Sequence, residues 1–316
     1  MIPTYNRSDY LEKTLRSVLD QNIGPDEMQI EVVDNCSTQS DPEQIVRSVG
    51  GDRVDFYRQP QNVGMSGNWT TCVKRARGHW VHILHDDDMV MPGFYEGYRQ
   101  LIEAHPEVSL VFSRGIGIDE HDNWTQLMWP APEYDEATGV GVLEDPIFEL
   151  STSGFILAPT AAVARRAYEQ VGGFMTNLVY TVDWEMWMRV ALTGPLGYIH
   201  MPRLLYRLHP GSDTERLTAQ GRTILELLRV RLINIRHVPE EQRQQALAQA
   251  YARASRDANA FRSSLHLKGK HVSAIYYAIW AIRLNLSLGT VLRLGKSLLL
   301  VTKAKAQSLT GPQSAK

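Results

Sequence analysis

The stretch that decides the fold is His79-Trp80-Val81-His82-Ile83-Leu84-His85-Asp86-Asp87-Asp88-Met89-Val90-Met91-Pro92-Gly93. Its apolar residues between 81 and 84 predict a buried strand, and Pro92-Gly93 predicts a turn beyond it. Between them stand three consecutive carboxylates, which repel one another unless something compensates their charge. A hard divalent cation such as Mg²⁺ or Mn²⁺ can do so, because it prefers oxygen ligands and keeps positions open for phosphate oxygens. The alternative is a solvated acidic turn or helix N-cap.

The composition is that of an ordinary globular protein. The 316 residues are 43% hydrophobic and 22% charged, and the net charge of −2 gives no field that favours nucleic acid. The two cysteines, Cys36 and Cys72, form no CxxC pair, which argues against a disulfide scaffold or zinc site and fits a reducing compartment. No signal peptide is visible, and no apolar run reaches the roughly 18 residues of a spanning helix. We therefore expect a cytoplasmic protein.

Upstream of the carboxylates, strands and helices alternate. A strand ends at Pro3, and its beginning looks missing because only two residues precede it. A helical stripe follows from Leu11 to Leu19, and further elements are expected at 30–33 (strand), 42–49 (helix) and 54–57 (strand). This order predicts an α/β fold with a mostly parallel sheet covered by helices. Asp34 ends the second strand, where open α/β sheets bind ligands, although a local turn is the alternative.

The segment Asn62-Val63-Gly64-Met65-Ser66-Gly67-Asn68 predicts a glycine-rich loop before a helix at 69–77. Backbone N–H groups near Asn62 and Gly64 can meet a phosphate there. Lys74, in the predicted helix, can reach a diphosphate, with a solvated helix face as the alternative. The segment matches neither the P-loop nor the dinucleotide-binding pattern.

Downstream, a helix is expected at 94–104, strands at 108–112 and 154–157, and a helix at 161–171. Residues 113–150 are interpreted as a long excursion from the core that forms an acceptor-side loop.

Three acidic or basic positions stand out beyond this excursion. Asp183 lies at or near the start of a predicted helix, where an N-cap is the alternative role. Glu185 precedes Arg189 by four residues, a spacing that also suits a purely structural ion pair. In Tyr206-Arg207-Leu208-His209, a histidine beside an arginine and a turn is a candidate phosphate or metal contact.

The chain from 218 to 305 is predicted to be mostly helical. No Asp or Glu follows Asp257, while lysines and arginines continue to the end. An amphipathic basic segment of this kind suits an anionic membrane surface. The alternative is a helical pair that packs against the catalytic part of the chain.

Several motifs, taken in order, carry a resemblance. They are Pro3-Thr4-Tyr5-Asn6-Arg7, Val32-Val33-Asp34-Asn35-Cys36-Ser37-Thr38, Asn62-Val63-Gly64, Asp86-Asp87-Asp88, Gly172-Gly173-Phe174, Val182-Asp183-Trp184-Glu185 and Tyr206-Arg207-Leu208-His209. Over residues 1–212 the chain resembles family 2 glycosyltransferases of the GT-A fold. The resemblance implies a GT-A domain at 1–215, with a nucleotide-binding part at 1–112 and an acceptor-side part at 113–215. Residues 216–316 would then form a helical region that contacts membrane.

The resemblance also implies roles for individual residues. Pro3, Thr4 and Tyr5 would line the nucleotide, and Asp34 would bind its base. The carboxylate triplet looks like the family's DxD motif, with Asp86 toward the ribose. The cation, Mg²⁺ or Mn²⁺, would be held by Asp87, Asp88 and His209, and Asp183 would be the catalytic base. Arg7, Asn62, Gly64, Lys74, Glu185 and Arg207 complete the expected substrate-binding set.

Together these features predict an inverting, metal-dependent glycosyltransferase that takes a sugar from a nucleotide sugar, UDP-linked by expectation. The acceptor would be a polysaccharide, lipid-linked glycan or protein, and the inner face of the plasma membrane is a candidate location. The alternatives are a non-catalytic sugar-nucleotide-binding or scaffold protein, and a nucleotidyltransferase. The sequence departs from the family at two places: it lacks apolar residues before Pro3, and Val182 stands where the family often has Glu.

Overall fold

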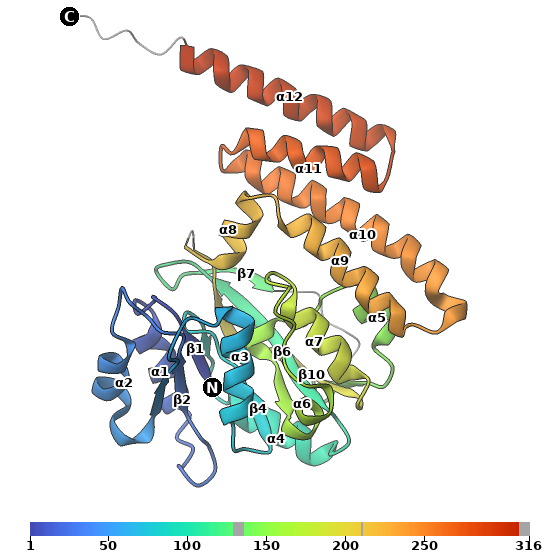
Figure 1. Ribbon diagram of the computed structural model, residues 1–316. Coiled ribbons are helices and arrows are strands. Elements are labelled where there is room, and N and C mark those ends of the chain that lie inside the picture. The colour runs from blue at the N-terminus through green and yellow to red at the C-terminus, as the bar shows by residue number, and fades with distance from the viewer. Residues whose placement is uncertain (129–135, 210, 310–316) are drawn as a thin grey trace, which may run out of the picture. The chain divides into compact units, whose positions relative to one another are not determined.

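The computed structural model describes residues 1–128, 136–209 and 211–309, which form two compact units (Figure 1). The first unit comprises Met1–Leu150 and Gly154–His209, and the second comprises Ser151–Ser153 and the described chain beyond His209. The boundary predicted at residue 215 falls inside helix α8 (Asp213–Ala219), which belongs to the second unit.

The first unit begins with a three-stranded parallel sheet. Its strands are β1 (Ile2–Thr4), β2 (Glu31–Asp34) and β3 (Asp55–Arg58). The helices between and after them are α1 (Leu11–Leu19), α2 (Pro42–Gly50) with the 3₁₀ turn Gly51–Arg53, and α3 (Gly64–Arg75). The register sets Thr4 beside Asp34, so the carboxyl ends of β1 and β2 lie at one edge. The predicted parallel nucleotide-binding sheet is confirmed in these three strands.

A second, mixed sheet completes the first unit. Its order is β4 (Trp80–His82), β9 (Ala162–Ala164), β6 (Leu110–Ile118), β10 (Leu196–Arg207) and β5 (Met89–Val90), with β7 (Trp124–Met128) on β6 and β8 (Val140–Leu143) on β10. Of these pairs only β6–β10 is parallel. The Met1 amino group donates to the His82 carbonyl (2.9 Å), and the Leu84 N–H donates to the Met1 carbonyl (3.0 Å), so β1 adjoins this sheet.

Three sequence predictions are wrong in this region. Residues 113–118 continue strand β6, and β7 and β8 follow, so the predicted excursion contributes three stretches to the sheet. Residues 129–135 of that excursion lie outside the described chain. Residues 154–157 form no strand, and Gly154 there lies against the Trp184 ring, where a Cβ would approach to 2.9 Å. The strand is β9 instead, inside the predicted helix, which begins only at α6 (Arg165–Val171).

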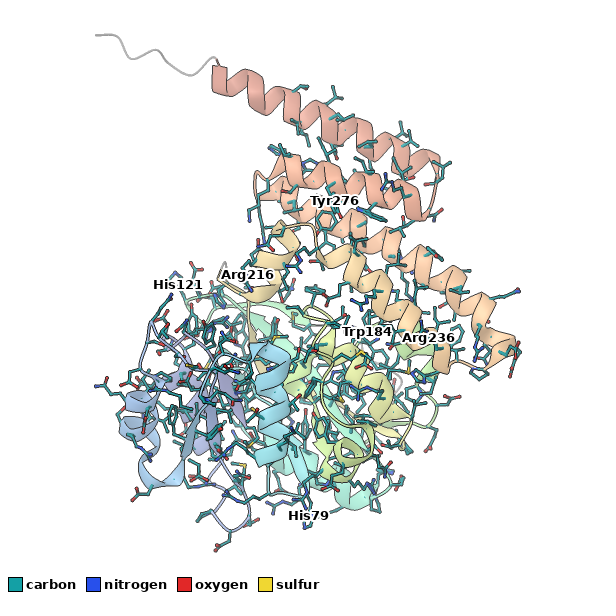
Figure 2. All side chains as sticks on the ribbon, viewed as in Figure 1. His79, His121, Trp184, Arg216, Arg236 and Tyr276 are labelled. Atoms are coloured by element: carbon teal, nitrogen blue, oxygen red, sulfur yellow. The ribbon has the colours of Figure 1, made fainter. Side chains whose placement is uncertain are left out.

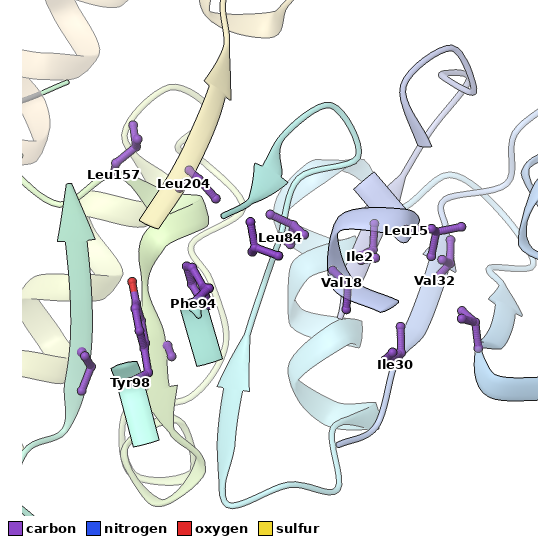
Figure 3. Packing of buried hydrophobic residues seen from close by; sticks show 14 of the residues in the cluster. Ile2, Leu15, Val18, Ile30, Val32, Leu84, Phe94, Tyr98, Leu157 and Leu204 are labelled. Carbon is purple, nitrogen blue, oxygen red and sulfur yellow. The ribbon is translucent and has the colours of Figure 1, made fainter. Parts of the chain in front are cut away.

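One hydrophobic core links both sheets and anchors the loop that carries the carboxylates (Figure 3). Leu15 and Val18 of α1 pack with Ile2 and Val32, and Phe94 and Tyr98 of α4 (Phe94–Ala104) belong to the same cluster. Leu84 and Val90, which flank the carboxylates in the chain, are also buried in it. The loop is therefore held at both ends by apolar burial.

The remaining elements of the first unit are the 3₁₀ turn Ala158–Thr160, helix α7 (Val182–Ala191) and the first four residues of helix α5 (Ile147–Thr152), whose last two residues belong to the second unit. The second unit is helical, as predicted. It consists of α8, α9 (Thr223–Asn234), the 3₁₀ turn Ile235–His237, α10 (Glu240–Leu267), α11 (His271–Leu284) and α12 (Leu288–Leu309). Alanines at 254, 258, 274 and 281 are fully buried with Tyr277, so α10 and α11 approach closely. Among the described helices none is both long enough and apolar enough to cross a membrane.

Candidate active site

The three carboxylates lie on the loop between β4 and β5, and all three are buried, with 0–7% of each residue exposed. Helix α1 contacts the backbone of this loop through Thr14. The hydroxyl of Thr14 lies 3.0 Å from the Asp86 carbonyl oxygen and 2.8 Å from the Asp88 carbonyl oxygen. Because α1 is the first helix after β1, these contacts link the first strand to the carboxylate loop.

Asp86 faces the end of β1. Its carboxylate accepts a 2.6 Å hydrogen bond from the Thr4 hydroxyl and lies 3.4 Å from the guanidinium of Arg7. Burial, reinforced by the charge of Asp87, raises the pKa of Asp86 to about 7. The structure thus joins Asp86 to Thr4 and Arg7, three residues that the sequence predicts for the substrate site.

Asp87 is the member of the triplet that contacts both Arg7 and His209. Its carboxylate pairs with the Arg7 guanidinium and lies 3.1 Å from Nε2 of His209. Burial raises the pKa of Asp87, but the His209 hydrogen bond and the Arg7 charge outweigh it, so the net pKa falls below the ordinary value. The predicted contact residue His209 therefore reaches the triplet from the end of β10.

Asp88 and His85 form the part of the site best suited to a cation. One oxygen of Asp88 accepts the backbone N–H of Arg207 (2.8 Å); the other lies 3.3 Å from Nδ1 of His85 and has no hydrogen-bond donor among the described residues. Burial raises the pKa of Asp88 to about 6, the adjacent His85 imidazole opposes this rise, and the Asp87 charge adds to it.

His85, Asp87 and Asp88 can each offer one ligand atom, all within 4.8 Å of one another. Nε2 of His85 is buried without a partner among the described residues, and its ring stacks on Trp69 with centroids 5.3 Å apart. Two carboxylates and an imidazole suit a hard or borderline divalent cation, so the residues present fit the predicted metal. His85 is not among the metal ligands that the sequence predicts, although its position directly before the triplet is a signal for that role.

Arg207 is buried against the carboxylate loop and is not exposed to solvent beside it. Its fully buried guanidinium donates to the carbonyls of Asp87 (2.9 Å) and Asp119 (2.8 Å), pairs with the Asp122 carboxylate (2.6 Å), and lies over the Tyr10 ring (4.2 Å). The sequence predicted a substrate contact here. The contacts instead tie strand β10 to the carboxylate loop.

Replacing this arginine should destabilise the first unit. Arg207→Leu removes one partner of a buried ion pair and leaves two carbonyls without their donor; we expect a loss of roughly 2–4 kcal/mol, moderated because Asp122 is partly in water. That corresponds to a fall in melting temperature of roughly 5–15 °C, measured by circular dichroism. Arg99→Leu, at an exposed ion pair with Glu27, is the control and should change stability by about 0.5 kcal/mol or less. Equal melting temperatures would contradict the assignment.

Asp34 and the glycine-rich segment are already engaged within the protein. The fully buried Asp34 carboxylate accepts from the Ser37 N–H and hydroxyl and from Nε of Arg58 (2.6 Å). Oδ1 of Asn62 accepts from the Gly64 N–H (2.8 Å). Helix α3 begins at Gly64, whose φ is +75°, so residues 65–68 form its first turn rather than the predicted loop.

The other predicted donor-side residues are scattered along β1 and α3. Pro3 is buried within β1, and Tyr5, just beyond it, is 44% exposed. Lys74 is not brought to the carboxylates: its neighbour Arg75 pairs with Glu31, the first residue of β2, whereas the triplet lies near the strand's opposite end. A helix between parallel strands runs back along the sheet, so its last turn ends far from the carboxyl edge.

Asp183 is the second residue of α7 and is half-buried. The loop before α7 packs on the first turns of α3: the Ser66 hydroxyl donates to the Leu178 carbonyl (3.3 Å), and Phe174 meets the edge of Trp69 with centroids 5.4 Å apart. Since Trp69 also stacks on His85, this packing connects the loop before Asp183 to the candidate metal ligands His85, Asp87 and Asp88.

Glu185 is occupied by a structural partner. Both of its oxygens pair with Arg189 at 2.7 and 2.8 Å, and this arginine also donates to the carbonyls of Val171 and Gly173. Glu185 therefore helps to hold the Gly172-Gly173 turn against the start of the helix.

Comparisons with known proteins bear on this site. A family model described as glycosyl transferase family 2 matches residues 1–171. An uncharacterized protein of Mycobacterium tuberculosis is 27% identical over 72% of each chain, and the chondroitin synthase of Escherichia coli is 25% identical over 67% of this chain but only 29% of its own length.

Solved structures share the architecture. Staphylococcus aureus TarS 1–349 in complex with UDP-GlcNAc has a TM-score of 0.62 at 17% identity, covering 90% of this chain and 80% of that one. The mannosyltransferase PcManGT of Pyrobaculum calidifontis, in complex with GDP-Man and Mn²⁺, has a TM-score of 0.56 at 18% identity, covering 99% and 86%. These likenesses confirm the predicted GT-A fold.

Proposed function

The chain belongs to glycosyl transferase family 2, and from this membership we propose that it moves a sugar from a nucleotide sugar to an acceptor hydroxyl with inversion at the anomeric carbon. One observation carries the proposal. Asp86, Asp87 and Asp88 are buried at a point where the end of β1, the β4–β5 loop and the end of β10 meet, each contributing polar groups to the same few atoms. Buried charges gathered in this way are typical of functional sites.

On the donor side, we assign the nucleotide to the edge formed by Pro3, Thr4 and Tyr5, with Asp86 and Arg7 beside it. The nucleotide complexes of the structural neighbours support a nucleotide-sugar donor, and the UDP-GlcNAc complex favours uridine. Asp34 shapes this edge through Ser37 and Arg58.

For the cation we assign Asp87, Asp88 and His85, with His209 next to Asp87. A bound Mg²⁺ or Mn²⁺ would neutralise the charge that grows on the leaving diphosphate. Without the cation, the Arg7 guanidinium places positive charge beside Asp87, and His209 lies within hydrogen-bond distance of the same carboxylate, which helps the chain to keep three carboxylates buried together.

For the base we assign Asp183. Asp183 lies in the first turn of α7, where the positive end of the helix dipole favours a carboxylate. This carboxylate takes the proton of the acceptor hydroxyl while the hydroxyl oxygen bonds to the anomeric carbon. The bond from that carbon to the diphosphate oxygen breaks on the opposite side, and the diphosphate leaves with the electron pair.

The acceptor we propose is a growing polysaccharide, a lipid-linked glycan or a protein, in a cytoplasmic reaction at or near the inner face of the plasma membrane. The acceptor would lie on the side of α7 and the segment from β7 to α5, which the sequence predicts as the acceptor-side part.

Calorimetric titration with UDP, GDP and dTDP, each with and without Mn²⁺, tests the proposal. We expect one nucleotide to bind. Its affinity should rise at least about tenfold with Mn²⁺, since a cation held by the carboxylates would attract the negatively charged diphosphate to the same site. Absence of binding to all three by the folded protein would favour the non-catalytic alternative. Binding of one nucleotide without any effect of Mn²⁺ would remove the cation from the mechanism.

A further inference from the structure

Helix α12 buries polar side chains and exposes apolar ones, the reverse of a helix that simply packs on its neighbours. Its buried side chains include Ser297, at 0% exposure, and Thr290, at 3%. Its exposed side chains include a set that we call the outer apolar face: Val291 (46%), Leu292 (64%), Leu298 (48%) and Leu299 (63%). An amphipathic helix covered only by its own protein would bury the leucines and expose the hydroxyls.

The outer apolar face is a continuous stripe. At about 100° per residue its four positions fall within about 120° of the helix circumference. Side chains project from α12 on the side turned away from α11, whereas the opposite side meets α10 through a 2.9 Å hydrogen bond between Ser297 and His266 (Figure 2). The stripe therefore has no partner within the described second unit.

Positive charge borders this stripe. Arg293 and Lys296 are exposed on α12 and, by the same helical spacing, lie between the stripe and the seam with α10. Arg262 of α10 lies near Arg293, is only 9% exposed, and its Nε has no partner among the described residues. No Asp or Glu follows Asp257, so no carboxylate of α11 or α12 balances these cations.

We propose that the outer apolar face of α12 binds the surface of an anionic lipid bilayer. The helix lies in the plane of the interface, with the leucines among the acyl chains and Arg293 and Lys296 at the lipid phosphates. The described helices cannot cross a bilayer, which leaves an interfacial position for this one.

Charge argues for lipid rather than for a second copy of the chain. A two-fold contact through this face would set Arg293 and Lys296 near the same cations of the other copy, and α12 has no carboxylate to pair with them. A bilayer of anionic lipid supplies the missing negative charge and the apolar phase together. This surface is independent of the proposed transfer reaction and can be tested without any sugar nucleotide.

The test is sedimentation of the full chain with vesicles of phosphatidylcholine alone or mixed with phosphatidylglycerol. We expect binding to the mixed vesicles, little to phosphatidylcholine, and a decrease as salt rises. Leu292→Gln with Leu299→Gln should weaken partitioning at least about tenfold. Arg293→Gln with Lys296→Gln should weaken it roughly 30-fold on mixed vesicles, from about a fivefold loss per cation.

Matched controls keep the result specific. Leu192→Gln with Met201→Gln removes two comparably exposed apolar side chains from the first unit, and Arg47→Gln with Arg99→Gln removes two exposed cations there; both pairs should bind vesicles like the parent chain. Helical circular dichroism must match among all variants.

Three outcomes would overturn the proposal. They are failure of the parent chain to bind mixed vesicles at low salt, equal losses in the first-unit controls, and a dimer in solution that becomes monomeric in the Leu292→Gln, Leu299→Gln variant. The last outcome, seen by light scattering, would identify a second copy as the occupant.

Discussion

Asp183→Asn should lower turnover by about 10²–10⁴-fold, because the amide keeps the shape of the carboxylate but cannot take the acceptor proton. Nucleotide affinity, with and without Mn²⁺, should stay within about twofold of the parent chain, since the predicted loss is confined to the transition state. Turnover is followed as nucleoside diphosphate release in the presence of acceptor, and affinity by calorimetry on the same preparation.

Glu169→Gln serves as the control for this experiment. Glu169 is an exposed carboxylate on α6 that pairs with Arg165, and its loss should leave turnover unchanged. Near-normal turnover in Asp183→Asn would show that another group is the base. Equal loss of affinity and turnover would indicate that Asp183 holds substrate instead.

Asp87→Ala should abolish the tightening of nucleotide binding by Mn²⁺ and lower turnover by roughly 10²–10⁴-fold, as expected for several kcal/mol of lost charge stabilisation. Two effects combine. The substitution removes one of two carboxylates offered to the cation, and it frees Arg7 and His209 from their shared partner. The measurement is the nucleotide dissociation constant over a Mn²⁺ series, with turnover at saturating donor.

Asp55→Ala is the matched control, because it removes an exposed carboxylate of β3 that pairs with Arg77. It should leave the Mn²⁺ effect intact. A normal Mn²⁺ effect in a folded Asp87→Ala protein would exclude Asp87 as a ligand and direct attention to Asp88 with His85.

Much of the fold follows from local patterns. The apolar periods of α1 and α4 predict both helices closely, and the strand–helix order upstream of residue 58 predicts the parallel sheet. The pattern failed at 154–164, where short apolar runs cannot distinguish a strand from a buried coil. There Gly154 packs closely against the Trp184 ring, and a contact between residues so far apart in the chain leaves no local signal.

For the site, the sequence named the triplet and the residues Thr4, Arg7 and His209 that contact it, but not His85. Arg207 and Glu185 carry the charge expected of substrate contacts, yet Arg207 hydrogen-bonds the Asp87 carbonyl and Glu185 pairs with Arg189. Lys74 lies in the last turn of α3, away from the carboxylates. His85 enters the cation group because its ring is placed between Trp69 and Asp88.

The sequence by itself determined which residues carry charge, where apolar periods begin and end, and that basic residues without acids follow Asp257. These properties depend on side-chain chemistry and on spacing along a few turns or strand residues. Only the tertiary structure decided which charges meet, that the second sheet is mainly antiparallel, and that Leu292, Leu298 and Leu299 of α12 face outward. Those outcomes depend on burial and on contacts between distant segments, whose free energies no local pattern contains.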